Sequence, residues 1–104
     1  MVMNAQRTRE PAQEQLDCLG KLGDELIRRG LCARLVLPPG RVPSLHVVNP
    51  QAAMLDEDVY ADRGSDGALW FWWSWAERIA VAGDVTTAAA VIARVLTGRG
   101  PGAP

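Results

Sequence analysis

Hydrophobic residues recur at steps of three and four between residues 11 and 29, a spacing typical of one buried face of an α-helix. The repeating apolar positions are Leu16, Leu19, Leu22, Leu26 and Ile27. Pro11 suits a first helical turn. Gly30 suits a left-handed cap, and Leu31 can make the hydrophobic contact that follows such a cap. The pattern therefore predicts a helix over residues 11–29.

The middle of the chain consists of short apolar runs separated by turn residues, which predicts β-strands. The expected strands cover residues 32–37, 44–49, 58–63 and 68–75. Residues 51–57 fit either a loop or a helical turn, and residues 76–83 are expected to be a connection. A second helix is predicted from Val85 to Leu96, with Asp84 as its N-cap and Gly98 closing it.

This order, α-β-β-β-β-α, is typical of an α+β fold, because hairpin-linked strands framed by helices favour an antiparallel sheet. We predict a four-stranded antiparallel sheet with two helices packed on one face. Residues 11–97 are expected to form a single α+β domain. Residues 1–10 are expected to be a disordered tail and residues 98–104 a flexible tail, since neither offers apolar residues for docking.

The turn at residues 65–67, Ser-Asp-Gly, decides which way the tryptophans of the fourth strand point. It fits a hairpin loop with glycine in the left-handed region, which sets Gly64 opposite Ala68. Directly opposed residues share a face. A loop one residue longer would place Asp58 against Trp73 and bury carboxylates, at a cost of several kcal/mol per group. The predicted core face therefore collects Val59, Ala61, Leu69, Phe71, Trp73 and Trp75.

The same alternation assigns the residues of the first two strands either to the core face or to the opposite, outer face, which then carries several aromatic and aliphatic side chains. Assigned to the core are Ala33, Leu35, Leu37, Leu45 and Val47. Assigned to the outer face are Arg34, Val36, Ser44, His46, Val48, Asp58, Tyr60, Asp62, Trp70, Trp72 and Ser74. The three aromatic rings and two valines of this face would expose several hundred Å², and the largest apolar patch on a monomer is about 300–600 Å². We therefore expect something to cover this face.

Composition narrows the class of protein. The chain has 104 residues, a formal net charge of -1 and 48% hydrophobic residues, which indicates one globular domain without a basic surface for nucleic acid. Cys18 and Cys32 lack metal-binding or redox spacing and are expected to be reduced core residues. The polar N-terminus predicts no signal peptide. The apolar run at residues 68–73 is far below the roughly 20 residues of a membrane span, so we expect a cytoplasmic soluble protein.

The sequence carries no catalytic signature. His46 is the only histidine and has no ligand spacing around it, so the pattern predicts a solvent-facing strand residue. Ser65 and Ser74 lack a nucleophile elbow. The acidic residues between Asp56 and Asp66 are typical of a solvated hairpin edge, although a carboxylate pair for acid–base work is conceivable. We therefore expect no enzyme, no catalytic residue, no metal site and no cofactor.

The segment DGALWFWWSWAERI is followed by a Gly-Asp helix cap and an alanine-rich helix ending in VIARVL. This arrangement resembles the C-terminal half of small uncharacterised actinobacterial α+β proteins, whose pattern also includes an Asn-Pro pair after a short strand, here Asn49 and Pro50. The likeness covers about residues 16–97. Such proteins are often neighbours of helix-turn-helix regulators, which implies a regulatory or partner role. The helix–sheet–helix order also looks like secretion-chaperone-like dimers, an analogy of fold alone.

Several occupants fit the outer face: a second copy, a different protein, a flat stacked ligand or a terminal segment of the same chain. We predict a non-enzymatic protein–protein interaction or regulatory domain that homodimerises through this face. The expected contact residues are Arg34, Val36, His46, Val48, Tyr60, Trp70 and Trp72. The alternative is a small-ligand-binding module with an aromatic pocket formed by Tyr60, Trp70, Trp72 and Arg34. Direct nucleic-acid binding and membrane insertion are not expected.

Overall fold

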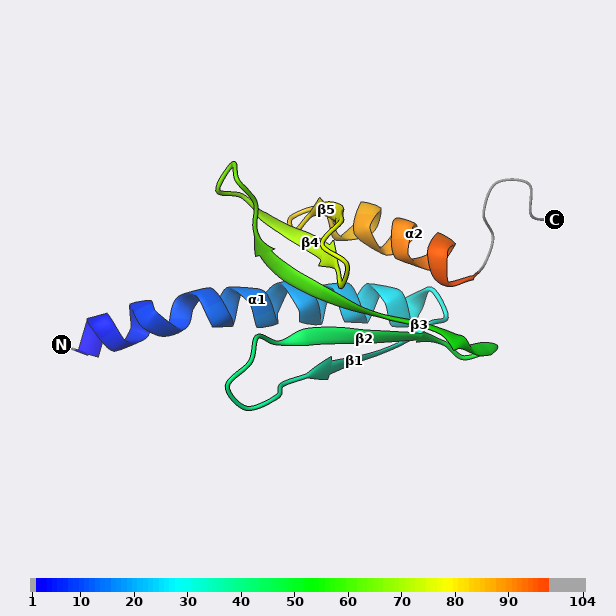
Figure 1. Cartoon of the computed structure of the whole chain (residues 1–104), viewed down its shortest axis with the longest axis horizontal. Coiled ribbons are helices and arrows are strands. Elements are labelled where there is room, and N and C mark those ends of the chain that lie inside the picture. The colour runs from blue at the N-terminus through cyan, green and yellow to red at the C-terminus, as the bar shows by residue number, and fades with distance from the viewer. Residues whose placement is uncertain (1, 98–104) are drawn as a thin grey trace.

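The computed structural model describes the backbone of residues 2–97 and the side chains of residues 13–52 and 54–97 (Figure 1). Its elements are α1 (Val2–Arg28), β1 (Cys32–Val36), β2 (Ser44–Asn49), β3 (Ala52–Arg63), β4 (Leu69–Trp73), β5 (Arg78–Val81) and α2 (Val85–Leu96). The strands form one antiparallel sheet in the order β1-β2-β3-β4-β5. The α+β class is confirmed, and the sheet has five strands where the sequence pattern predicted four.

The strand that the prediction missed is β5, which lies in the segment expected to be a connection. The turn before it explains the miss. The Trp73 N–H donates to the Glu77 carbonyl at 2.8 Å, and the Ala76 N–H donates to the Trp73 carbonyl at 3.0 Å. Ala76 has a φ of 68°, the left-handed position that a glycine normally takes in this kind of hairpin loop. Because an alanine stands there, the sequence shows no turn signal.

The long strand β3 pairs with β2 along its first part and with β4 along its last part, and only Val59 pairs with both. It begins at Ala52 and so includes residues 52–57 of the segment expected to form a loop or a helical turn. Its first half pairs with β2 as far as Val59, and the residues from Val59 to Arg63 pair with β4. The sheet therefore consists of two hairpins splayed apart on one diagonal strand, as Figure 1 shows.

Helix α1 begins at Val2, nine residues earlier than the predicted start at Pro11, so residues 2–10 carry helical backbone. The prediction of a disordered tail relied on the lack of apolar residues there. Intrinsic helix propensity does not need them, since methionine, alanine, glutamine, arginine and glutamate all favour helix. Residues 98–104, predicted as a flexible tail, and Gly98 as the closing residue of α2 lie outside the described residues.

The end of α1 confirms the predicted cap. Gly30 has a φ of 94°, and the Leu31 N–H donates to the Leu26 carbonyl at 3.0 Å. Leu31 is buried directly after this cap. The cap turns the chain sharply, so that β1 runs back along the helix that precedes it.

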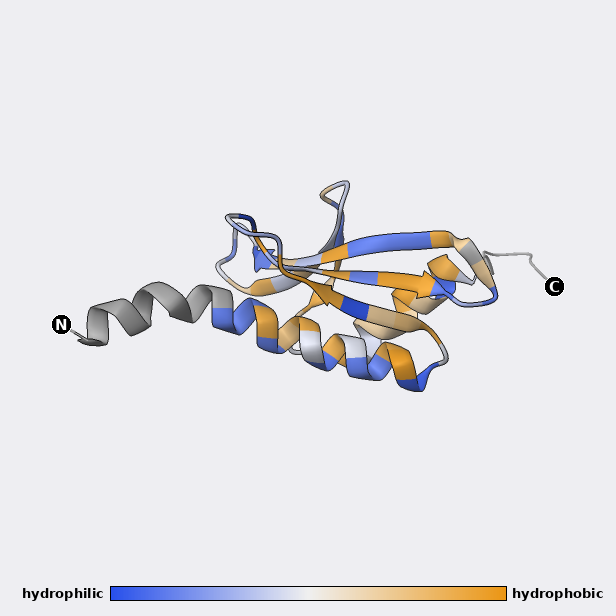
Figure 2. Ribbon diagram, turned by 90° about the horizontal axis from the view of Figure 1, so that it is seen from below, coloured by the Kyte–Doolittle hydropathy of each residue, from blue (hydrophilic) through white to orange (hydrophobic). Residues whose placement is uncertain are grey.

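Both helices pack against one face of the sheet and against each other. The buried core between them includes Leu19, Leu22, Leu26, Leu45, Val47, Val59, Phe71, Trp73, Ala88, Ile92 and Leu96. Figure 2 shows α1 running along this face, with hydrophobic and hydrophilic positions alternating along the helix. Since both helices take the same side, the opposite face of the sheet has no helix over it among residues 2–97.

Candidate functional site: the outer face of the sheet

The register of the hairpin between β3 and β4 is the predicted one. The Gly64 N–H donates to the Ala68 carbonyl at 2.8 Å, and Gly67 has a φ of 83°. The opposed pairs are Val59–Trp73, Tyr60–Trp72, Ala61–Phe71, Asp62–Trp70 and Arg63–Leu69. Val59, Ala61, Phe71 and Trp73 are buried in the core. Tyr60, Trp70 and Trp72 consequently lie on the other side, which we call the outer face.

Trp75 was predicted in the core, and this is wrong. Its side chain is 50% exposed, because β4 ends at Trp73 and the following turn interrupts the alternation of faces. The ring stacks on the Trp73 ring with 4.9 Å between centroids and 6° between planes. Its indole N–H donates to Glu77 at 2.8 Å. Trp75 therefore covers the edge of the core from outside.

Two leucines near the first edge of the sheet were also assigned to the core and are exposed. Leu35 is 37% and Leu37 61% exposed, because β1 is an edge strand and α1 covers it only in part. Cys32, expected in the core, is exposed as well, and the register of β1 places it on the outer face opposite Val48. Ser44 lies on the outer face as predicted and is buried there.

The predicted aromatic residues Trp70 and Trp72 share a cation that the sequence pattern did not reveal. The guanidinium carbon of Arg78 lies 4.5 Å from the centroid of the Trp70 ring and 5.5 Å from that of Trp72. Arg78 stands opposite Trp72 on β5, the strand that the prediction missed. A cation over an aromatic face is attracted by the ring quadrupole. Part of the aromatic patch is therefore covered by a side chain of the same molecule.

The hairpin loop closes around this arginine. A Cβ atom on Gly64 would come within 3.1 Å of the Asp66 carboxylate and 3.2 Å of the Arg78 guanidinium, so a larger residue there would require these side chains to shift by a few tenths of an ångström. Asp66 accepts hydrogen bonds from the Ala68 N–H at 3.1 Å and from the Trp70 indole at 3.4 Å. The bond from Ala68 contributes most to lowering the pKa of Asp66, with further contributions from Trp70 and Arg78. The carboxylate is thus held ionised next to the cation.

The other half of the outer face belongs to β1 and β2 and is mainly aliphatic. Val36 and Val48 are half-buried on it. Arg34 is exposed, and none of the described side chains forms a hydrogen bond or ion pair with its guanidinium. This half therefore presents two valines and one accessible cation.

His46, predicted to face solvent, is held between two carboxylates of β3. Its Nδ1 lies 2.8 Å from Asp58 and its Nε2 3.3 Å from Asp56. Both ring nitrogens therefore face a carboxylate, and a protonated imidazole can donate to both. Among the described residues, no three or more His, Cys, Asp or Glu side chains are arranged to hold a metal ion. The contacts fix the ring against the neighbouring strand.

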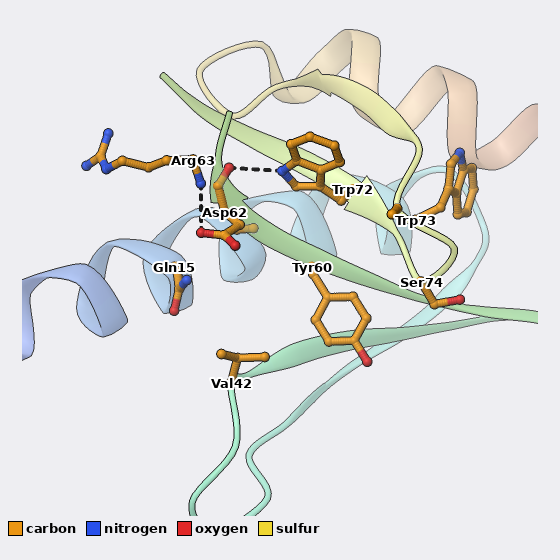
Figure 3. Close-up of a pocket in the computed structure, with 10 residues that line it drawn as sticks. Gln15, Val42, Tyr60, Asp62, Arg63, Trp72, Trp73 and Ser74 are labelled. Atoms are coloured by element: carbon orange, nitrogen blue, oxygen red, sulfur yellow. Dashed lines mark hydrogen bonds between the residues drawn. The ribbon is translucent and has the colours of Figure 1, made fainter. Parts of the chain in front are cut away.

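A hollow of about 400 Å³ opens where the outer face meets the loop between β1 and β2 (Figure 3). It is lined by Gln15, Val42, Tyr60, Ala61, Asp62, Arg63, Trp72, Trp73, Ser74 and Ala76. The Trp72 indole donates to the Asp62 carbonyl at 3.0 Å on its rim. Of the four residues expected to form an aromatic pocket, Tyr60 and Trp72 line this hollow, and Trp70 and Arg34 do not.

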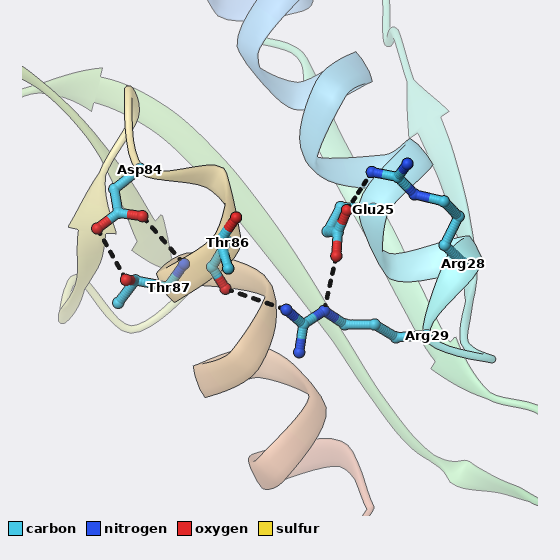
Figure 4. Close-up of polar contacts among 6 residues, drawn as sticks. All are labelled: Glu25, Arg28, Arg29, Asp84, Thr86 and Thr87. Carbon is cyan, nitrogen blue, oxygen red and sulfur yellow. Dashed lines mark hydrogen bonds and ion pairs between the residues drawn. The ribbon is translucent and has the colours of Figure 1, made fainter.

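A second group of polar contacts lies away from the outer face, where the two helices meet (Figure 4). Arg29 donates to Glu25 at 3.0 Å and to the Thr86 carbonyl at 3.5 Å, which ties the end of α1 to the start of α2. Hydrogen bonds from Arg29, and then from Arg28, lower the pKa of Glu25. These contacts serve the packing of the helices.

The predicted N-cap of α2 is confirmed by the same view. Asp84 accepts from the Thr87 N–H at 3.2 Å and from the Thr87 hydroxyl at 2.7 Å. The hydroxyl bond contributes first, and the backbone bond second, to a lowered pKa of Asp84. At the other end of α2, Asn49 donates to the Leu96 carbonyl at 2.8 Å and so satisfies one of the last backbone acceptors.

Comparison of the chain with protein families, curated proteins and solved structures finds no match. Over residues 2–97, neither helix combines the length and the apolar character needed to cross a bilayer. The residues of the outer face and of the hollow are therefore the basis for assigning a function.

Proposed function

We propose that the protein is a non-enzymatic, cytoplasmic interaction domain with a regulatory role, and that it forms a homodimer through the outer face. One observation carries this proposal. Both helices occupy the opposite face, so Tyr60, Trp70 and Trp72 have no element of residues 2–97 over them except the side chain of Arg78. Tyrosine, tryptophan and arginine are the residues that most often anchor protein interfaces.

The two halves of the outer face complement each other, which favours a second copy as the occupant. A two-fold axis along β3 would lay β1 and β2 of one copy over β4 and β5 of the other. Val36, which lies level with Tyr60 along the sheet, would then meet the Trp72 ring, and each copy would make the same contact twice. This pairing removes Val36 and Trp72 from water together.

Sedimentation equilibrium over a range of concentrations tests the proposal with two matched variants. Val36→Glu places a charge on the outer face, and Val95→Glu places the same charge on an exposed position of α2. We expect a dimer for the unmodified chain and for Val95→Glu, and at least about tenfold weaker association for Val36→Glu. A monomer at every concentration, or equal weakening by both variants, would contradict the proposal.

The hollow beside Tyr60 supports a second candidate, a small-ligand-binding module. Its volume of about 400 Å³ falls in the range of small-molecule sites, roughly 300–1,000 Å³. Tyr60 and Trp72 supply aromatic surface, and Gln15, Asp62 and Ser74 supply polar groups. Tryptophan fluorescence titrated with a panel of aromatic fragments tests this candidate. Quenching that Tyr60→Ala abolishes supports it, and quenching that survives in this variant contradicts it.

A further inference from the structure

The first strand of the sheet, β1, has one free side. It stands at the end of the strand order, and its partner in the sheet is β2 alone (Figure 1). Among residues 2–97, no backbone hydrogen bond outside that ladder reaches residues 32–36. Cys32, Arg34 and Leu35 are exposed, so solvent reaches this strand. An unpaired strand edge presents a row of N–H and C=O groups to which another extended chain can bind.

The hairpin between β3 and β4 shows which residues of β1 turn their backbone groups toward the free side. In an antiparallel pair, successive residues turn their N–H and C=O alternately toward and away from the partner strand. The Gly64 N–H donates to the Ala68 carbonyl, so the even-numbered residues of β3 bond to β4 and the odd-numbered ones to β2. The register carries this alternation across β2 to β1. Arg34 therefore bonds to β2, whereas Ala33 and Leu35 turn their N–H and C=O groups outward.

A groove of about 180 Å³ lies between this edge and α1. Gly20, Asp24 and Ile27 line it on the helix, and Ala33 and Leu35 line it on the strand. A Cβ atom on Gly20 would meet no atom within 4 Å, so this glycine leaves the space open. A cavity of about 150 Å³ with apolar walls holds a benzene ring. The groove is therefore large enough for one leucine side chain of a strand added at the edge.

Arg34 sets the charge of the residue that fits at the centre of such a strand. Its side chain is exposed on the outer face. In an antiparallel strand added to β1, the residue opposite Arg34 shares that face, and its two neighbours point toward α1 and the groove. Opposite charges across two strands are favourable, and like charges are unfavourable. The edge therefore fits the order apolar, acidic, apolar.

A second copy of β1 does not supply this order. Residues 29–43, which include β1 and the chain on either side of it, contain no Asp or Glu. No antiparallel register of one β1 on another therefore places a carboxylate opposite Arg34. The register centred on Arg34 sets the two guanidinium groups directly against each other, which is destabilising. The edge consequently favours a segment of a different protein.

We propose that the β1 edge binds an extended peptide segment of another protein, with an acidic residue between two apolar ones, as a sixth strand of the sheet. This interaction goes beyond the proposed homodimer and does not depend on it. The acidic side chain pairs with Arg34, and one apolar side chain fills the groove beside Gly20. Asp24 on the groove wall favours a lysine at the next position on the same face of the peptide.

The peptide acetyl-KTLELTK-amide has this order, and N-methylated versions of it test the strand pairing. We expect the peptide, at up to about 1 mM, to shift the Ala33 and Leu35 amide signals in nuclear magnetic resonance spectra. N-methylation of a leucine should weaken binding at least about fivefold, because that N–H bonds to β1. N-methylation of the glutamate is the matched control and should have no effect, since its N–H points away. Equal effects of the two modifications, or no shift at Ala33 and Leu35, would overturn the proposal.

A charge exchange tests the contact with Arg34. Arg34→Glu with the original peptide, and the unmodified protein with acetyl-KTLKLTK-amide, should each bind at least about two- to fivefold more weakly. The two changes together should restore binding, because they exchange the charges of the pair. Failure of the combination to recover affinity would contradict the acidic position of the peptide.

Gly20→Leu tests the groove, and Lys21→Leu, an exposed change one residue along α1, is its control. Gly20→Leu should stay folded, since its Cβ has open space and leucine favours helix more than glycine does. It should bind the peptide at least about tenfold more weakly because its side chain fills the groove, whereas Lys21→Leu should bind normally. Equal binding by both variants would refute the groove. Shifts at Ala33 and Leu35 that depend on protein concentration without peptide would assign the edge to a second copy and overturn the proposal.

Discussion

Replacing Trp73 or its neighbour Trp72 with alanine should have very different effects on stability. Trp73 is 4% exposed and packs in the core beneath α1 and α2. Removing a buried tryptophan side chain costs about 3–5 kcal/mol, since it loses the transfer free energy of the ring and leaves a cavity. The free energy of unfolding of a small domain is about 5–15 kcal/mol. Trp73→Ala should therefore leave a marginal or unfolded chain.

Trp72 faces outward, and its contacts are fewer. Together with Trp70 it contacts the Arg78 guanidinium, whose carbon lies 5.5 Å from the centroid of the Trp72 ring. Its indole N–H also donates to the Asp62 carbonyl at 3.0 Å. The cation contact is worth about 0.5–1 kcal/mol at a partly exposed site. The hydrogen bond adds about 1 kcal/mol. Trp72→Ala should therefore cost about 1–2 kcal/mol, and the chain should stay folded.

Urea unfolding followed by far-ultraviolet circular dichroism measures both variants. With a slope of about 1–3 kcal/mol per molar urea, the two midpoints should differ by about 1 M or more. The titrations are run at two low protein concentrations, because association would add to the apparent stability of any variant that still dimerises. If Trp72→Ala lowers the midpoint as far as Trp73→Ala does, the assignment of the two faces is wrong.

Four further outcomes are expected. Ala76→Gly should raise the free energy of unfolding by about 0.5–1 kcal/mol in urea titrations, because glycine adopts the left-handed φ of this turn without strain; a loss of stability would contradict the turn geometry. Arg78→Ala should lower stability by about 1 kcal/mol and alter tryptophan emission, and unchanged emission would refute the stacking on Trp70 and Trp72. Ellman's reagent should modify exposed Cys32 faster than Cys18, whose pKa is raised by burial, and the Cys32 rate should fall with protein concentration if the outer face dimerises. The pKa values of Glu25, Asp66 and Asp84 are lowered in the folded state, so these carboxyls favour folding only while they are ionised. In thermal scans the stability should therefore be full above about pH 4.5 and fall on acidification. A flat profile down to about pH 3 would argue against the contacts of these three residues.

The hairpin around Gly67 could be predicted because its turn has a strong local signal. Glycine in the left-handed position set the register, and the register separated Trp73 from Trp72 correctly. The caps at Gly30 and Asp84 were predictable for the same reason, since each depends on one or two residues close in sequence.

The missed features depend on contacts that no local pattern encodes. Ala76 takes a backbone conformation that alanine rarely adopts, and this hid β5 together with Arg78. Because the sequence pattern did not place Arg78 beside the tryptophans, it predicted an uncovered aromatic patch. In the structure the Arg78 guanidinium covers part of that patch. Leu35 is exposed because α1 covers only part of an edge strand, which depends on how the helix crosses the sheet and not on the alternation of residues.

The hollow beside Tyr60 also lay beyond the reach of the sequence pattern. Pro43 was a visible clue, because proline cannot donate to a strand ladder. The length of β3 beyond its pairing with β2 was not visible, since residues 51–57 suggested a loop or a helical turn. The hollow thus arises from the offset of two ladders along one strand.

The central claim is that two copies meet through the outer face, and intermolecular nuclear Overhauser effects between isotope-labelled and unlabelled protein test it most directly. We predict a species of twice the 11.2 kDa chain mass, with contacts between the Val36 methyl groups of one copy and the Trp72 indole of the other. The absence of intermolecular contacts at high concentration, or contacts that involve Ile27 and Leu37 instead, would contradict it.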